Sequence, residues 1–213
     1  MRTHYYAFGS ICRGELDEGS DIDLLACVTG EKPPIDASKF SIYTHDRLVD
    51  LWQEGNPFAW HLYLESRLLY SSDGEDFIAV SLGTPSPYRQ ASSDCNKFKR
   101  LFLESVAALS EGPNSTIFHL SCIFLATRNF ATCYSLAAGK PMFSRRSPLL
   151  VDQTLLINRD TFNILSRARI LSTRGHGRTL SHQEIKEAIT SLPAIEAWMN
   201  RLLPAGAERD RVQ

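Results

Sequence analysis

The sequence predicts an N-terminal α/β domain, a small mixed sheet with helices, followed by an all-α helical bundle. Up to about residue 80, short apolar runs alternate with turns, which is typical of strands. Beyond residue 90 the apolar residues recur at helical spacing over long segments. Two prolines within residues 83–90 indicate an irregular linker. We therefore expect one domain over residues 1–85 and a second over residues 91–204.

The first part contains five short candidate strand segments and one candidate helix. The strand candidates are Tyr5–Phe8, Ile22–Val28, Phe40–Tyr43, and a pair formed by Leu62–Leu64 and Leu68–Tyr70. The helix is expected over Asp46–Glu54, because its apolar residues lie at helical spacing and Gly55 follows as a stop.

The second part reads as an antiparallel helical bundle. The expected helices run from near Ser93 to before Gly112, from the cap residues 114–116 to Gly139, from Ser147 to about Leu171, from Ser181 onward, and from Pro193 to near Leu203. Proline after Ser147 is typical of a first helical turn, and Ser181 with Glu184 forms a capping-box pattern.

Composition places limits on partners and location. The formal net charge of -1 gives no global attraction to nucleic acid or to a membrane, so nucleic acid is disfavoured as the main partner. The five cysteines are scattered, as expected of reduced thiols in the cytoplasm. The longest apolar stretch, Ile117 to Ala138, contains Arg128, which favours a buried helix over a membrane span. We expect a cytoplasmic protein.

Gly9 and Ser10 form the first part of a candidate site. They follow a short β segment, and a glycine there allows the backbone to approach a phosphate closely. The backbone amides beyond Gly9 can bind an anion, and the Ser10 hydroxyl can donate to a phosphate oxygen. Arg13 lies one turn further on and can add positive charge.

Asp21 and Asp23 form the second part. They open an apolar strand and are separated by one residue, so strand alternation places both carboxylates on the same face. Two convergent carboxylates repel one another unless a cation lies between them. Mg²⁺ binds through a few carboxylates together with water and substrate phosphates. The pair therefore predicts a magnesium-bound nucleoside triphosphate, with Asp21 and Asp23 as metal ligands and catalytic residues.

In this order and spacing the two parts resemble the signature of the minimal nucleotidyltransferases of the DNA polymerase β superfamily. The matching positions are Gly9, Ser10, Arg13, Gly14, Ser20, Asp21 and Asp23. Aminoglycoside nucleotidyltransferases and the antitoxin partners of HEPN toxins are similar. The resemblance covers about the first 80 residues and extends more weakly over residues 61–70. It implies that Gly9, Ser10, Arg13 and Ser20 bind the nucleotide and that Asp21 and Asp23 bind magnesium.

The sequence departs from this family at a third carboxylate. Members of the family carry one on the next strand, and the matching segment here, residues 39–43, has Ser41 at that position. Serine is a poor magnesium ligand and cannot take a proton from the acceptor as a carboxylate can. Glu65 is a candidate substitute, as are Asp46 and Asp50, although each of the three also fits a solvated surface.

The resemblance implies Mg²⁺-dependent transfer of a nucleoside monophosphate, AMP from ATP, onto a hydroxyl of a small molecule or a protein. The alternative is a catalytically weak nucleotide-binding module, a regulatory or antitoxin-like partner. Ser41 favours the alternative, whereas Gly9, Ser10 and the two aspartates favour the enzyme. A homo-oligomer and a complex with a toxin both remain open.

Overall fold

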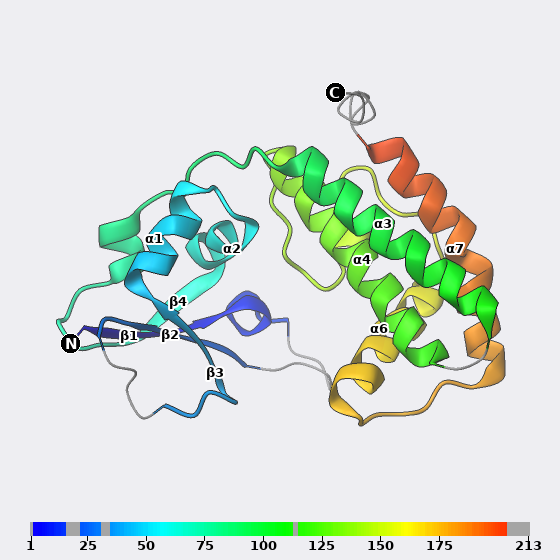
Figure 1. The fold of residues 1–213 in the computed structure, drawn as a ribbon, viewed down its shortest axis with the longest axis horizontal. Coiled ribbons are helices and arrows are strands. Elements are labelled where there is room, and N and C mark those ends of the chain that lie inside the picture. The colour runs from blue at the N-terminus through cyan, green and yellow to red at the C-terminus, as the bar shows by residue number, and fades with distance from the viewer. Residues whose placement is uncertain (1, 16–21, 31–34, 113–114, 204–213) are drawn as a thin grey trace. The chain divides into compact units, whose positions relative to one another are not determined.

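The computed structural model of the chain describes residues 2–15, 22–30, 35–112 and 115–203. The chain divides into two units, residues 1–89 and residues 90–213 (Figure 1). The first unit contains a mixed four-stranded sheet with helices, and the described part of the second is mainly helical. The fold class expected from the sequence is therefore confirmed.

The sheet of the first unit has the strand order β3-β2-β1-β4. Its strands are β1 (Thr3–Phe8), β2 (Asp23–Val28), β3 (Phe40–Thr44) and β4 (Ser66–Ser71). β1 pairs antiparallel with both β2 and β4, whereas β2 and β3 are parallel.

Two helices, α1 (His45–Gln53) and α2 (Pro57–Glu65), lie over one face of this sheet (Figure 1). Alternate residues of β1 and β2 point toward the helices, as the two-residue period of a strand requires. The resulting core contains Tyr6, Phe8, Leu25, Cys27, Leu48, Leu51, Trp52, Ala59, Leu62 and Ile78. A short turn of π-helix (Phe77–Leu82) follows β4.

The prediction of a strand at Leu62–Leu64 is wrong, because these residues form the last turns of α2. The signal for a helix lies upstream, where Asn56 accepts a hydrogen bond from the Phe58 amide at 2.9 Å and Pro57 occupies the first helical turn. The apolar run alone does not distinguish a short strand from a buried helix. Only the second half of the expected strand pair becomes β4.

Residues 83–90 have no regular secondary structure, as expected, but the first part of this linker is attached to the first unit. The indole N–H of Trp52 donates to the Gly83 carbonyl at 2.8 Å, and that of Trp60 donates to the Ser86 carbonyl at 3.1 Å. The Ser86 amide in turn donates to the Trp52 carbonyl at 2.9 Å. These bonds hold residues 83–86 against α1 and α2.

The second unit is built around the apolar helix α4. Its helices are α3 (Ala91–Glu111), α4 (Thr116–Ala137), α5 (Ser147–Leu150), α6 (Arg159–Arg174) and α7 (His182–Leu202). α4 packs against each of the other four. No helix in the described part of the chain is both long enough and apolar enough to cross a membrane.

Two helix predictions in this unit are wrong. The helix expected from Ser147 to Leu171 is interrupted after Leu150, and a new helix begins where the Asn158 side chain accepts a hydrogen bond from the Asp160 amide at 2.8 Å. Pro193 does not start a new segment but lies inside α7, which begins with the expected capping box at Ser181. The bundle expected to end at residue 204 is described up to residue 203.

Candidate functional site

A tight turn follows the end of β1. Gly9–Arg13 form a short 3-10 helix that ends at Gly14, and both glycines adopt left-handed backbone conformations, with φ of 76° and 71°. The Glu15 amide donates to the Ser10 carbonyl at 3.0 Å, which closes the turn. Glycine is favoured at both ends, because other residues adopt this backbone region at a cost.

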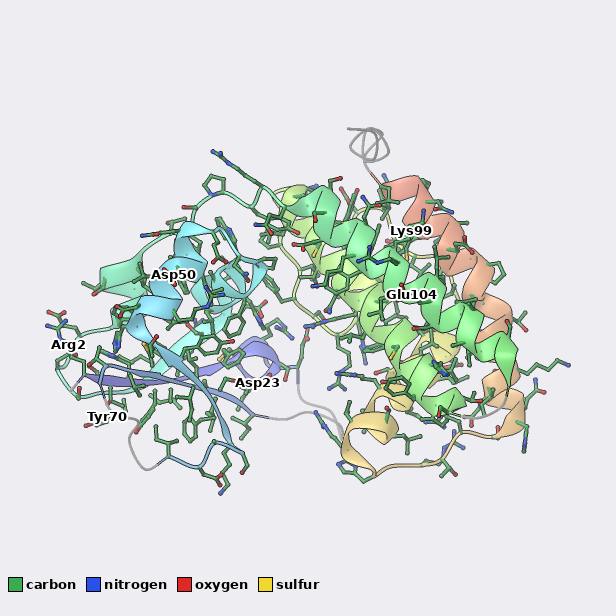
Figure 2. The ribbon with its side chains drawn as sticks, viewed as in Figure 1. Arg2, Asp23, Asp50, Tyr70, Lys99 and Glu104 are labelled. Carbon is green, nitrogen blue, oxygen red and sulfur yellow. The ribbon has the colours of Figure 1, made fainter. Side chains whose placement is uncertain are left out.

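Asp23 lies beside this turn because β1 and β2 are antiparallel. Phe8 pairs with Asp23 on one side and with Ser66 of β4 on the other, so the three residues form a row across the end of the sheet. A Cβ atom on Gly9 would lie 2.8 Å from Oδ2 of Asp23. The Asp23 carboxylate therefore faces the backbone of the turn directly, in space that only glycine leaves open (Figure 2).

Three further charged or polar side chains meet on the α2 side of the turn. The Arg13 guanidinium contacts the Glu65 carboxylate and, at 3.1 Å, the Glu15 carboxylate. Nε2 of His61, one helical turn before Glu65, lies 3.0 Å from Oε2 of Glu65. The side chains of Arg13, His61 and Glu65 are only 15–18% exposed. Glu65 therefore anchors Arg13, and with it the turn, to the end of α2.

A groove opens at the start of β2 and β3. It encloses about 550 Å³ and is lined by residues 22–24 and 37–41. Ser41 pairs with Leu25 across the parallel strands, which places it on the same face of the sheet as Asp23. The charged side chains of the lining are Asp23 and Lys39, and Ser38 and Ser41 supply hydroxyl groups.

This arrangement has a counterpart among known protein families. Residues 2–67 match the family model of the nucleotidyltransferase domain. The N-terminal unit carries a nucleotidyltransferase domain. The match includes β1, the Gly9 turn, β2, β3 and both helices up to the first residues of β4. The resemblance inferred from the sequence is thereby confirmed. No curated protein matches the chain.

The electrostatics of the nucleotidyltransferase domain keep Glu65 ionised. Burial opposes the charged form of Glu65, but the adjacent imidazole of His61 and the positive charge of Arg13 outweigh it, so the pKa of Glu65 lies below its usual value. Glu65 is thus a carboxylate already engaged by two neighbours. Its contacts fit a role in holding the turn, and its proposed role as a third metal-binding carboxylate has no support in these contacts.

Of the two carboxylates predicted to bind a metal ion, Asp23 belongs to the described residues. Ser20 and Asp21 lie outside the described residues. Asp23 is exposed at the start of β2 and offers the hard oxygen donors that Mg²⁺ binds. No group of three metal-ligating side chains occurs within the described segments. The Asp23 carboxylate is therefore chemically suited to bind a Mg²⁺ ion at this end of β2.

The structure brings most of the described site residues predicted from the sequence together. Gly9, Ser10 and Arg13 lie in one turn, and Asp23 faces it. His61 was not predicted as a site residue. Its signal in the sequence is its spacing of four residues from Glu65, which places both on one helical face, but that signal has meaning only once α2 is recognised as a helix.

Proposed function

We propose that this chain is a Mg²⁺-dependent nucleotidyltransferase that moves AMP from ATP onto a hydroxyl group of a small molecule or a protein. The observation that carries the proposal is the approach of the Asp23 carboxylate to the Gly9 backbone within a domain that matches the nucleotidyltransferase family. A turn suited to phosphates and a carboxylate suited to a cation then flank the same small space.

In the proposed reaction, the acceptor hydroxyl oxygen attacks the α-phosphorus and forms a new P–O bond. The bond from the α-phosphorus to the oxygen that bridges to the β-phosphate breaks, and pyrophosphate leaves with that electron pair. The backbone of the Gly9 turn, the Ser10 hydroxyl, Ser20 and the Arg13 guanidinium bind the triphosphate. Asp21 and Asp23 would hold Mg²⁺, which neutralises triphosphate charge and favours in-line attack when bound. The hydroxyl proton passes to solvent or to a nearby carboxylate.

The groove beside Asp23 is the proposed entrance for the acceptor. Its volume of about 550 Å³ suits a small molecule or one side chain of a protein. Ser38 and Ser41 of the groove offer hydrogen bonds to an acceptor molecule. The apolar lining of the groove includes Ile22 and Phe40. The five free cysteines support a cytoplasmic location.

The second candidate is a nucleotide-binding regulatory module with little turnover, such as an antitoxin-like partner. The observation that favours it is the pairing of Ser41 with Leu25. This pairing places a neutral side chain on the same face of the sheet as Asp23, at the position where the family has a carboxylate. Such a module would bind ATP and Mg²⁺ without consuming them and would act through an oligomer or a protein partner.

A transfer assay with ATP labelled at the α-phosphate separates the two candidates. The wild type is compared with Asp23→Ala and with the Asp21→Ala/Asp23→Ala double variant, using aminoglycosides and a cell lysate as acceptors. Asp50 is exposed on α1 and lies 3.8 Å from Arg47, which fits the solvated surface that the sequence also allows for it, so Asp50→Ala is the matched control (Figure 2). Label on an acceptor with the wild type and Asp50→Ala, but not with the Asp23 variants, supports the enzyme. Binding without transfer supports the module, and absence of binding contradicts both.

A further inference from the structure

The two units of the chain carry opposite net charges. The 23 basic and 24 acidic residues are divided unevenly, with 7 basic and 14 acidic residues in residues 1–89 but 16 basic and 10 acidic in residues 90–213. The overall charge of -1 is therefore the sum of about -7 and about +6. The chain as a whole gives no net attraction to anions, whereas the helical unit, with its net positive charge, does.

One strongly positive segment of the helical unit runs from residue 167 to residue 186. This segment contains Arg167, Arg169, Arg174, Arg178 and Lys186, and its single carboxylate is Glu184. In the structure the segment comprises the last part of α6, the loop that follows it and the first turn of α7, and α6 and α7 pack against each other. We call this surface the α6–α7 basic surface.

Glu184 does not neutralise this surface. Its carboxylate accepts hydrogen bonds from Arg167 at 2.8 Å and from Arg178 at 2.5 Å, so two guanidinium groups share one negative charge. The hydrogen bond with Arg167, together with the Ser181 amide, lowers the pKa of Glu184 to about 2. The carboxylate is therefore ionised at physiological pH, and the surface still retains a net positive charge. Glu184 also holds Arg178 in place at the edge of the loop.

The loop between α6 and α7 is suited to close contact with an extended anion. It begins at Gly175, continues through His176 and Gly177, and both glycines have positive φ angles of 66° and 109°. Gly177, His176 and Arg178 are exposed. Without side chains at the two glycines, a phosphate group can approach the backbone between Arg174 and Arg178.

An exposed aromatic ring lies in the neighbouring part of the unit. Phe118, in the first turn of α4, is 55% exposed and its ring lies 5.5 Å from that of His119. One turn later, Ser121 receives a hydrogen bond from Arg169 at 3.4 Å, so the start of α4 packs against the arginine-bearing part of α6. Single-stranded nucleic acids stack their bases on exposed aromatic rings and bind their phosphates to cations, and this unit exposes both kinds of group.

We propose that the α6–α7 basic surface binds the sugar–phosphate backbone of a single-stranded nucleic acid. Arg167 and Arg174 are seven residues apart on α6 and hence separated by about 10 Å along the helix axis. Successive phosphates of a strand can contact cations spread over that length. The exposed ring of Phe118 favours a nucleic acid over a lipid headgroup, because a base can stack on it.

The test is fluorescence anisotropy of the full chain with a labelled single-stranded RNA of mixed sequence, measured at several salt concentrations. The wild type is compared with Arg174→Gln/Arg178→Gln and with the matched control Lys97→Gln/Arg100→Gln. The control removes the same charge from α3, whose first turns pack near Phe130 toward the opposite end of α4. Circular dichroism and thermal melting establish that each variant is folded.

We expect the wild type to bind RNA with an affinity that falls steeply as salt rises. The Arg174/Arg178 variant should bind more weakly. The slope of its plot of log affinity against log salt concentration should be smaller in magnitude by about 1.4, because each of the two lost phosphate contacts contributes about 0.7 to that slope. The control should resemble the wild type. No RNA binding, an equal loss in both variants, or binding only to anionic lipid vesicles would overturn the proposal.

Two further measurements separate this surface from the nucleotide site. Asp23→Ala should leave RNA binding unchanged, and ATP with Mg²⁺ should not compete with RNA. Competition by ATP would instead place the RNA in the triphosphate site and contradict the proposal. Since neither measurement depends on transfer, the RNA surface can stand if the proposed transferase activity fails, and the reverse also holds.

Discussion

Two features require glycine at position 9, its backbone conformation and the close approach of Asp23. Comparison with Gly14 separates their effects. The Gly9 backbone is left-handed, and a Cβ atom would meet the Asp23 carboxylate at 2.8 Å. Gly14 has a similar φ, but a Cβ atom there would meet nothing within 4 Å. We expect Gly14→Ala to lower the free energy of unfolding by about 1–2 kcal/mol through backbone strain alone. Gly9→Ala should cost more and should also weaken ATP binding, because Asp23 must move.

Urea unfolding and isothermal titration with ATP and Mg²⁺ measure the two effects. Equal ATP affinity for both alanine variants would contradict the inferred contact between the Gly9 turn and Asp23. Both variants replace a glycine of positive φ with alanine. A difference between them therefore reports the close approach of Asp23 to Gly9.

Glu65 should make the first unit more stable at neutral pH than in acid. The lowered pKa of Glu65 means that the folded state favours its charged form, so this stabilisation is present above the usual value of 4.5 and is lost as the pH falls through the lowered pKa. Glu65→Gln should cost about 1–3 kcal/mol of unfolding free energy at neutral pH, because Arg13 loses its charged partner. The cost should shrink in acid.

Urea unfolding across the pH range checks this expectation. Glu104→Gln provides the control, because Glu104 lies on α3 in an exposed pair with Arg100 at 3.9 Å (Figure 2). An exposed ion pair contributes little to stability, so Glu104→Gln should change the free energy of unfolding by about 0–1 kcal/mol. A cost of Glu65→Gln that does not depend on pH would contradict the ionic role of Glu65.

At the scale of elements, Pro193 lies inside α7 without interrupting it. Proline has no amide hydrogen, so the carbonyl four residues earlier lacks its helical partner. The Pro193 side chain is exposed, and its removal therefore leaves no cavity. We expect Pro193→Ala to stabilise the helical unit by about 1–3 kcal/mol, measured by thermal unfolding. A destabilised variant would show that the proline fits α7 without cost.

The junction of β1 and α1 should weaken in mild acid. Nδ1 of His4 lies 3.1 Å from Nε2 of His45, and the other nitrogen of His4 lies 3.1 Å from Asp73, which Arg2 also contacts. Burial, with smaller contributions from the charges of His4 and Arg2, lowers the pKa of His45 below its usual 6.5, although the Val28 carbonyl opposes the shift. The folded state thus favours neutral His45. Its stability is full above pH 6.5 and declines as the pH falls toward the lowered pKa.

Urea unfolding at about pH 7.5 and about pH 5.5 tests the contribution of His45. For one proton, the free energy of unfolding should fall by at most about 1.4 kcal/mol per pH unit. His45→Gln cannot titrate and should show a flatter profile. If the two proteins lose stability in parallel, a group other than His45 is responsible.

The sequence predicts elements well where a local signal coincides with the tertiary fold. Phe40–Tyr43 and the helix beginning at Asp46 are found nearly as expected, because alternation and helical spacing agree with burial. It fails at Leu62–Leu64 and Pro193, where packing against the core overrides an apolar run or a helix breaker.

The candidate site is likewise predictable only where its residues are near one another in the sequence. Gly9 and Asp23 are close in the sequence, whereas the contact of Arg13 with Glu65 spans 52 residues.

At the scale of the molecule, each unit has the length and the core to unfold separately. The first unit buries its own cluster around Leu25 and Leu48, and the second packs around α4. We expect calorimetry to show two heat-absorption transitions. ATP with Mg²⁺ should raise the midpoint of one, because a ligand stabilises the unit that binds it. Pro193→Ala should move the other. A single transition shifted by both changes would contradict independent units.

The placement of the three tryptophans gives the protein an intrinsic optical read-out of each unit. Trp52 and Trp60 both donate to carbonyls of the linker, whereas Trp198 lies in α7 and donates to the Gln153 carbonyl at 2.6 Å. A Trp198→Phe protein would therefore emit only from the two indoles attached to the linker, and their emission would shift to longer wavelength if that segment detached and water reached the rings. No dye would be needed to follow the chain between the two units in real time.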